Sequence, residues 1–285
     1  MTSTLDPKLA SWIGRSTSAA DVVTPGMLDG FLAMLDHETP APAGAVAPQG
    51  IHWLCATPRV RARDIGGDGH AHLGLLLPPV DLPRRMWAGS SIEFHKVIRL
   101  GDRVERQSMI RAITPKQGSA GPLVFVEVDH AIRANGEVAL NEQHTIVFRS
   151  PPDFSQRAGS EKKSQEEMPE PSTFSRTVRP DPVLLFRYSA LTFNSHRIHY
   201  DHPYVTGVEG YPGLVVHGPL VATLLLDLAA EHCGPNALKR FSFRGLAPAF
   251  ADEPLLLEGR KRPDGLHLRA ASGDGRLVMA AEGSL

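Results

Sequence analysis

Residues 217–233, HGPLVATLLLDLAAEHC, predict a long helix that is apolar on almost every side. Such a helix is stable only when it is buried, because it has no face that suits water. Gly234 and Pro235 end it, since neither residue favours continuing a helix. The runs that follow have the composition of strands; they are FSFRGLAPAF (241–250), EPLLLEGR (253–260), LHLRAAS (266–272) and RLVMAAE (276–282). This order predicts an α+β fold in which an antiparallel sheet wraps a buried helix.

A strand and a second helix precede the long helix. Residues 174–178 have the composition of a strand, and residues 181–194, DPVLLFRYSALTFN, have that of a helix. Asp181 suits the N-cap of this helix, and Pro182 suits its first position, where the missing N–H of proline costs nothing. The second half therefore runs strand, helix, long helix and closing strands.

The first half repeats this plan. Residues 21–37, DVVTPGMLDGFLAMLDH, predict a helix with Thr24 as its N-cap and Pro25 in its first position. From about 51 to 149 the pattern changes to short runs of period two, and Asn135-Gly136 is a strong hairpin signal because both residues tolerate positive φ. A weak sequence similarity between EFHKVIRLGD (93–102) and SFRGLAPAFAD (242–252) also favours an internal duplication.

A polar segment separates the two halves. Residues 151–173, PPDFSQRAGSEKKSQEEMPEPST, are rich in charge and turn formers and have almost no apolar periodicity, which predicts a solvated linker. We therefore expect a first repeat over 1–150 and a second repeat over 174–285.

The amino-acid composition excludes several classes of protein function. The 285 residues carry 30 Lys and Arg against 31 Asp and Glu, for a net charge of −1, so a protein that binds the nucleic-acid backbone is not expected. No apolar run has the length of a signal peptide or a membrane span, which predicts a cytoplasmic protein without a membrane partner. Cys55 and Cys233 fit neither a disulfide framework nor a zinc motif.

Two neighbouring stretches of sequence contain the polar residues that are candidates for an active site. RYSALTFNSHRIHYD (187–201) places Asn194, His196, Arg197 and His199 within six residues, where a predicted helix gives way to a loop. GYPGLVVHGP (210–219) brings small residues to the start of the long helix, where free N–H groups and the helix dipole favour an anion or a polarised carbonyl.

These are the groups needed to add water to an α,β-unsaturated thioester. His199 suits the base that deprotonates water, because an unperturbed imidazole titrates near pH 6.5. Asn194 suits the group that positions the water or His199, and the Gly218 N–H suits the donor that holds the enolate oxygen.

On these residues the chain resembles the MaoC-like hydratases and hydroxyacyl-thioester dehydratases, or hydratase 2 family. Their motif reads Gly-Asp-x-Asn-Pro-aliphatic-His, followed about 20 residues later by a His-Gly helix start. Here Asn194 stands at the Asp, His196 at the Asn, Arg197 at the Pro and His199 at the catalytic His, while 217–218 match the helix start. The resemblance implies a double hotdog fold, in which a long helix wrapped by an antiparallel sheet occurs twice, with the catalytic motif in the second repeat.

The variants LTFNSHRIHYD (191–201) and LPRRMWAGSSIEFHKVIRLGD (82–102) resemble one branch of the family more closely. That branch hydrates 3-methylfumaryl-CoA, which is mesaconyl-C4-CoA, and has relatives that act on itaconyl-CoA. The substrate carboxylate must not be buried unpaired, and the guanidinium of Arg197 suits it through a bidentate contact. His196 would add a second donor.

Tyr188 and His217 complete the predicted substrate-binding residues. No metal or redox cofactor is expected, because the CoA belongs to the acyl-thioester substrate. A homodimer is expected by resemblance.

Several alternatives stay open. Asn194 is also suited to a helix-end turn, Arg197 to an ion pair with Asp201 or Glu209, and His217 to closing a loop onto the helix. At the level of function, the rivals are a general enoyl-thioester dehydratase, a thioester hydrolase, and a non-catalytic acyl-thioester-binding subunit in which the change to Asn194 records lost activity.

The first half offers weaker signals. Residues 84–87, Arg-Arg-Met-Trp, suit either a binding site for CoA phosphates or a solvated basic turn beside a buried Trp, and the turn is the favoured interpretation. His70 and His72 are spaced as a metal pair on a strand, yet no third ligand is apparent, so no metal site is predicted.

Overall fold

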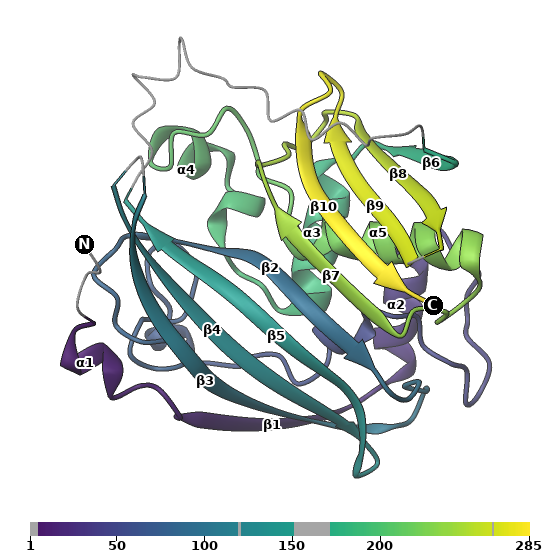
Figure 1. Cartoon of the computed structure of the whole chain (residues 1–285), viewed down its shortest axis with the longest axis horizontal. Helices are drawn as coiled ribbons and strands as arrows, with labels where there is room; N and C mark the ends of the chain where they lie inside the picture. Colours follow the sequence, from purple (N-terminus) through teal and green to yellow (C-terminus); the bar gives the residue numbers. More distant parts are fainter. Residues whose placement is uncertain (1–4, 119–120, 151–171, 264) are drawn as a thin grey trace.

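The computed structural model describes residues 5–118, 121–150, 172–263 and 265–285. Its strands form one antiparallel sheet in the order β1-β3-β4-β5-β2-β7-β10-β9-β8-β6. From the central pair β2 and β7, each half of the sheet runs outward through its last, fourth, third and first strand, so both halves have the same topology (Figure 1). Most of the predicted linker, 151–171, lies outside the described residues.

The two halves join directly through their backbones. Strand β2 pairs with β7 over five residues, with Ser91 opposite Ser242. The strands of the first half are β1 (Ser16–Val22), β2 (Arg84–Phe94), β3 (Arg103–Gly118), β4 (Gly121–Ala134) and β5 (Glu137–Arg149). Those of the second half are β6 (Phe174–Val178), β7 (Arg240–Gly245), β8 (Leu255–Arg262), β9 (Gly265–Ser272) and β10 (Leu277–Ser284).

The long helix predicted for the second half is α5, and its residues from Leu220 to Ala229 are all buried. The described helices are α1 (Pro7–Ala10), α2 (Pro25–Met34), α3 (Pro182–Thr192), α4 (His202–Gly207) and α5 (Gly218–Cys233). The described 3-10 turns are η1 (Ile51–Trp53), η2 (Ala62–Asp64) and η4 (Arg197–His199). Helix α3 begins as predicted, because the Asp181 side chain accepts a hydrogen bond from the Leu184 N–H at 2.7 Å.

The first half departs from two sequence predictions. Its helix α2 begins at Pro25 after the Thr24 cap, as expected, but it spans 10 residues, and the start of the predicted range 21–37 belongs to β1. Strand β1 lies at the edge of the sheet with most of its residues exposed, so it lacks the apolar alternation that identifies strands. Between β1 and β2 the chain forms only α2 and the 3-10 turns η1 and η2, so this part of the first half has no helix as long as α5.

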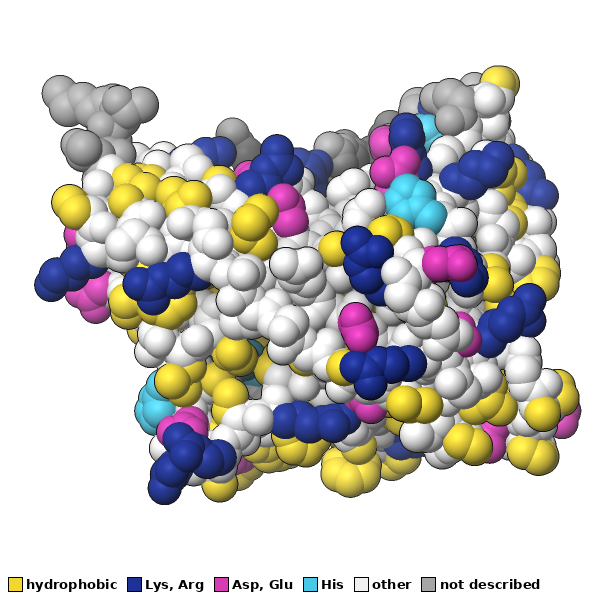
Figure 2. Space-filling model, turned by 90° about the horizontal axis from the view of Figure 1, so that it is seen from below, with side chains coloured by type: hydrophobic (Ala, Val, Ile, Leu, Met, Phe, Trp, Pro, Cys, Tyr) yellow, Lys and Arg dark blue, Asp and Glu magenta, His cyan; other side chains and the backbone are white. Residues whose placement is uncertain are grey.

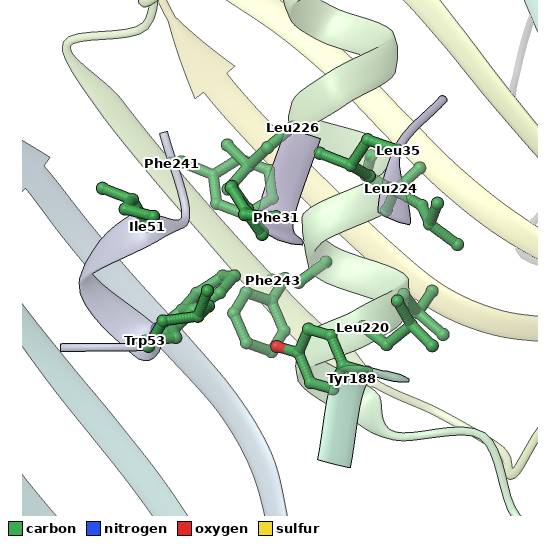
Figure 3. Packing of buried hydrophobic residues seen from close by; sticks show 14 of the residues in the cluster. Phe31, Leu35, Ile51, Trp53, Tyr188, Leu220, Leu224, Leu226, Phe241 and Phe243 are labelled. Carbon is green, nitrogen blue, oxygen red and sulfur yellow. The ribbon is translucent and has the colours of Figure 1, made fainter. Parts of the chain in front are cut away.

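One hydrophobic core fills the space between the helices and the sheet. Figure 3 shows Phe31 of α2, Trp53 of η1 and Phe243 of β7 converging on the side chains of α5. Because both halves supply this core, each half stabilises the other. Burying one side chain of this size contributes about 1.5–3 kcal/mol.

A second cluster lies in the first half. The segment between η2 and β2 lays apolar side chains, including Leu77 and Val80, against the apolar residues of β3, β4 and β5. Phe148 is fully buried there. This segment also carries residues 66–72, which contact the predicted catalytic motif of the second half.

Among the described residues, no helix combines the length and the apolar character that crossing a bilayer requires. On the face shown in Figure 2, the Lys and Arg side chains are interspersed with acidic and apolar ones. This face therefore lacks the contiguous basic patch that typifies nucleic-acid binders.

Candidate active site

His199 lies at the end of the loop that links α3 to α4. Helix α3 ends at Thr192, and Phe193 turns the chain with a φ of 52°. The Nδ1 atom of His199 lies 2.7 Å from the carbonyl oxygen of Val215. A carbonyl oxygen only accepts, so Nδ1 carries the hydrogen and Nε2 keeps its lone pair. Burial lowers the pKa of His199 to about 4, so at pH 7 the ring is neutral and Nε2 is available as a base.

His217 packs against the His199 ring, and Tyr188 packs against His217. The rings of His199 and His217 stack with centroids 3.5 Å apart, and His217 Nε2 lies 2.8 Å from the Ser189 hydroxyl. The Tyr188 ring packs 5.0 Å from His217, fully buried, and its hydroxyl points into the core in Figure 3. The Tyr188 side chain therefore lies inside the core, and its contact with a substrate stays a prediction. His217 is only 1% exposed, which favours a role in supporting the His199 ring.

Gly218 occupies the predicted place at the start of α5. The first N–H groups of a helix have no acceptor within that helix, so the Gly218 N–H is available to an oxygen. The 16-residue helix behind it adds the positive end of its dipole. Its role at a thioester oxygen stays a prediction.

Asn194 makes a turn. Its Oδ1 accepts a hydrogen bond from the His196 N–H at 3.0 Å, which fixes the loop that leads to His199. The alternative of a turn residue is therefore observed, and the amide NH₂ group is the part of Asn194 that remains suited to positioning water.

Arg197 is partly exposed, and neighbouring residues fix its guanidinium. Its Nε and Nη2 atoms donate to Asp201 at 3.0 and 2.8 Å, and Nη1 donates to the Gly67 carbonyl at 2.9 Å. The guanidinium also lies 4.0 Å from the centroid of the Tyr204 ring. The contact between Arg197 and a substrate carboxylate stays a prediction, and such a carboxylate would have to compete with Asp201, which accepts from both Nε and Nη2.

A turn of the first half, residues 66–70, packs against residues 193–201, which carry the predicted catalytic residues and are called the catalytic loop below. The Asp68 carbonyl accepts from the Arg197 N–H at 2.9 Å, and the Gly69 carbonyl accepts from the Ser195 hydroxyl at 2.6 Å. The contact is so close that a Cβ on Gly69 would lie 1.8 Å from the Ser195 carbonyl oxygen. Gly69 also has a φ of 89°, which favours glycine.

This docking places an Asp–His pair beside the predicted site. The Nδ1 of His70 lies 3.0 Å from Asp68 Oδ2, and the His70 ring lies against His196 with centroids 3.9 Å apart. His196 in turn meets the ring of His199 edge-on at 5.4 Å. Sequence analysis missed the pair, because it treated His70 and His72 as neighbours on a strand, whereas they lie in a turn and a loop.

One polar atom each from Asp68, His70 and His196 lies within 4.8 Å of the others. The pair of His70 and Asp68 is already hydrogen-bonded, and the positive charge of Arg85 acts on both side chains. A cation would have to displace that bond and approach that charge. We therefore interpret the group as a hydrogen-bonded proton-transfer set.

Arg85 lines a pocket of about 140 Å³ beside this group. The pocket walls include Asp68, Leu73, Leu82 and Phe148, so Arg85 and Asp68 are its charged residues. Arg85 donates to the Ala71 carbonyl at 3.1 Å. The favoured interpretation of residues 84–87 as a solvated turn is wrong, because they begin β2 and Arg84 forms a 3.0 Å ion pair with Glu209.

Comparison with known proteins identifies the family. Residues 50–251 match the family described as hydroxyacyl-thioester dehydratase type 2. The chain belongs to this family. Mesaconyl-C(4)-CoA hydratase of Chloroflexus aurantiacus is 41% identical over 273 residues, 95% of each chain. The mitochondrial hydroxyacyl-thioester dehydratase type 2 of Schizosaccharomyces pombe is 28% identical over 230 residues, covering 72% of this chain and 75% of the relative.

Solved structures agree on the fold. HtdX of Mycobacterium tuberculosis aligns with a TM-score of 0.68 at 17% identity, over 95% of this chain and 99% of HtdX. A MaoC-like dehydratase from Phytophthora capsici gives 0.69 at 13% identity, over 97% of each chain. A Mycobacterium tuberculosis protein described as a double hotdog gives 0.60 at 14% identity, over 97% of each chain. The predicted double hotdog fold is confirmed, and family membership makes the chain an enzyme of the hydratase and dehydratase type.

Proposed function

We propose that this hydratase adds water to mesaconyl-C4-CoA. The supporting observation is the neutral His199, whose Nδ1–H is fixed on Val215 and whose Nε2 is left as a base, in a chain 41% identical to a mesaconyl-C(4)-CoA hydratase over nearly its whole length. Itaconyl-CoA hydration and general enoyl-thioester dehydration are the alternatives within the same chemistry.

The first steps of the proposed reaction use three residues. His199 Nε2 takes a proton from water while the water oxygen attacks the β carbon, and Asn194 positions that water through its amide. The electrons of the double bond move onto the thioester oxygen, where the Gly218 N–H holds the developing charge. One such donor contributes on the order of 10²–10³-fold to the rate. The CoA enters as part of the substrate, and the proposed steps use no other cofactor.

We place the substrate carboxylate at Arg85. In a 3-methylfumaryl thioester the β carbon carries both the methyl group and the carboxylate, so the cation that receives the carboxylate must lie near the attacked carbon. Arg85 meets this need better than Arg197, because it lines a pocket together with Asp68 and its charge acts on His70 and His196. Within the described residues Arg85 forms no ion pair, whereas Arg197 is paired with Asp201. The apolar wall formed by Leu82 and Phe148 suits the methyl group.

The direct test is a hydration assay that follows loss of enoyl-thioester absorbance. Mesaconyl-C4-CoA, itaconyl-CoA and crotonyl-CoA are compared with the purified protein. A preference for mesaconyl-C4-CoA supports the proposal, whereas a preference for crotonyl-CoA contradicts the carboxylate pocket. Release of free thiol without hydration would favour the thioester hydrolase, and binding without turnover would favour the acyl-thioester-binding subunit.

His199→Ala separates a catalyst from a binding subunit. We expect the variant to keep its fold and to lose about 10²–10⁴-fold in kcat, the range that a positioned general base contributes. A cytoplasmic location and a homodimer remain part of the proposal. Cell fractionation tests the location, and sedimentation of the purified protein tests the dimer.

A further inference from the structure

The proposed hydration ends with a proton transfer to the α carbon, which either the protonated His199 or a second acid must perform. After water attacks the β carbon, the α carbon must gain a proton, and Asn194 cannot supply one because its amide does not titrate near neutral pH. His199 has taken the proton from water and is held by the Val215 carbonyl. A second titratable group close to His199 is therefore of chemical interest.

We propose that His70, oriented by Asp68, is the second acid–base group of this active site and protonates the α carbon. The inference rests on the proposed hydration. It assigns the proton transfer to a turn of the first half, whereas the family resemblance places the catalytic motif in the second repeat.

Geometry fixes the tautomer of His70. An ionised carboxylate only accepts hydrogen bonds, so the 3.0 Å contact with Asp68 requires the hydrogen of His70 to lie on Nδ1. The same carboxylate accepts from the His70 backbone N–H at 2.9 Å, which locks the turn. Nε2 is then the atom that receives and donates the catalytic proton, and Asp68 stabilises the imidazolium when it forms. Asp68 acts through His70 and is a positioning residue.

Access and distance also fit this role. The side chains of His70 and Asp68 are 27% and 35% exposed, whereas His199 is buried, so His70 can meet a substrate that enters from solvent. His196 links the two rings, with centroids 3.9 Å from His70 and 5.4 Å from His199. The docked turn holds this spacing through the close contact at Gly69.

His196 is less suited than His70 to carry the proton. Burial is the main cause that lowers the pKa of His196, and the nearby His70 and His199 rings lower it further. Burial also lowers the pKa of His70, but the hydrogen bond to Asp68 opposes that shift. Within the described residues, His70 is the one of these three imidazoles that is hydrogen-bonded to a carboxylate, whereas His199 is hydrogen-bonded to a backbone carbonyl. His196 therefore serves as the neutral spacer between the two proton-transfer groups.

Atoms and charges are conserved over the complete reaction. His199 Nε2 takes a proton from water, the water oxygen bonds to the β carbon, and the thioester enolate forms. The enolate re-forms its carbonyl as the α carbon takes the proton from His70 Nε2. His70 begins the cycle as an imidazolium and ends it neutral, while His199 ends it protonated. One proton therefore moves from His199 to His70 through solvent before the next turnover.

The charges that face His70 come from several elements. They are Asp68 on its own turn, His196 and His199 on the catalytic loop, Arg85 on β2, and Glu209 after α4. Arg85 opposes a protonated His70, whereas Asp68 and Glu209 favour it. Removing the Asp68 charge should therefore make His70 lose its proton at lower pH, and this effect gives a readout that a purely structural role would not produce.

The experiment measures kcat and KM for mesaconyl-C4-CoA across pH in His70→Gln and Asp68→Asn. We expect His70→Gln to lower kcat about 10²-fold with little change in KM. We expect Asp68→Asn to lower kcat about 10-fold and to move the alkaline limb of the kcat profile to lower pH. The matched controls are His95→Gln, an exposed histidine of the first half, and Asp64→Asn, a carboxylate of the same connecting segment; both should keep the wild-type profile.

Three results would overturn the inference. A His70→Gln variant whose kcat stays within about 2-fold of wild type would leave His199 to act alone. An Asp68→Asn variant that loses activity without moving the alkaline limb would make Asp68 purely structural. Activity that disappears on chelation and returns with Zn²⁺ would make the group of Asp68, His70 and His196 a metal site. A wild-type protein that hydrates none of the enoyl thioesters would instead refute the proposed function, and this inference with it.

Discussion

Gly69 provides the sharpest test of how the two halves cooperate. A methyl group on its Cα would lie 1.8 Å from the Ser195 carbonyl oxygen and 2.8 Å from the Ser195 carbonyl carbon. Both atoms belong to the backbone, so no side-chain rotation relieves the overlap. The φ of 89° adds a conformational cost of roughly 1–2 kcal/mol for any residue with a Cβ. In Gly69→Ala we therefore expect the turn to retreat from the catalytic loop.

The magnitude follows from what the docked turn contributes. Three hydrogen bonds join the turn to Ser195 and Arg197, with lengths of 2.6, 2.9 and 2.9 Å. At about 1 kcal/mol each, their loss lowers the free energy of unfolding by at most about 3 kcal/mol. The overlap can be removed only by a shift of about 1 Å or more, and a misplacement of that size costs on the order of 10²-fold in rate. We expect kcat for mesaconyl-C4-CoA to fall by that factor while the sheet stays folded.

The matched control is Gly67→Ala in the same turn. An ideal Cβ on Gly67 meets no heavy atom within 4 Å. The substitution also keeps the Gly67 carbonyl that accepts a hydrogen bond from Arg197. Steady-state hydration kinetics and urea unfolding of the two variants are compared with wild type. The reasoning is refuted if Gly69→Ala keeps wild-type kcat, or if both alanine variants lose activity equally.

Other variants test individual groups. Arg85→Met should raise KM for mesaconyl-C4-CoA at least 10-fold while changing crotonyl-CoA hydration little, because only the dicarboxylic substrate loses a pair of charge-assisted hydrogen bonds. Equal effects on both substrates would refute the contact between Arg85 and the carboxylate. Asn194→Ala should lower kcat by orders of magnitude, whereas Asn194→Asp should keep substantial activity, and an unchanged alanine variant would exclude Asn194 from the mechanism. Burial lowers the pKa of His130 to about 2, so the folded state keeps this ring neutral below the unfolded pKa near 6.5. The unfolded state then binds more protons, and the free energy of unfolding should fall with decreasing pH between about 6.5 and 2, at up to about 1.4 kcal/mol per pH unit from this residue. Urea unfolding of wild type and His130→Gln at pH 7, 6 and 5 checks this, and equal slopes would show that another group is responsible.

The helices illustrate what local sequence determines. Thr24 and Asp181 accept hydrogen bonds from backbone N–H groups three residues onward, so the starts of α2 and α3 depend on neighbouring residues alone. The largely apolar character of α5, with Asp227 as its one charged residue between Leu220 and Ala230, likewise required burial wherever the helix was placed. Strand β1 could not be found in this way, because an exposed edge strand carries no apolar alternation.

The site residues likewise divide into those that local sequence identifies and those that only the tertiary structure brings together. Sequence alone determined that the chain has two similar halves, that α5 is buried, and that His199 and Gly218 lie in one chemical motif. Only the tertiary structure decided that Arg197 is held by Asp201 and Gly67, and that Asp68 and His70 stand beside that motif. Caps and apolar periodicity act between residues a few positions apart, whereas Gly69 and Ser195 are separated by 126 positions. Their contact depends on how the β2–β7 pairing brings the two halves together, and no local pattern in the chain encodes that distance.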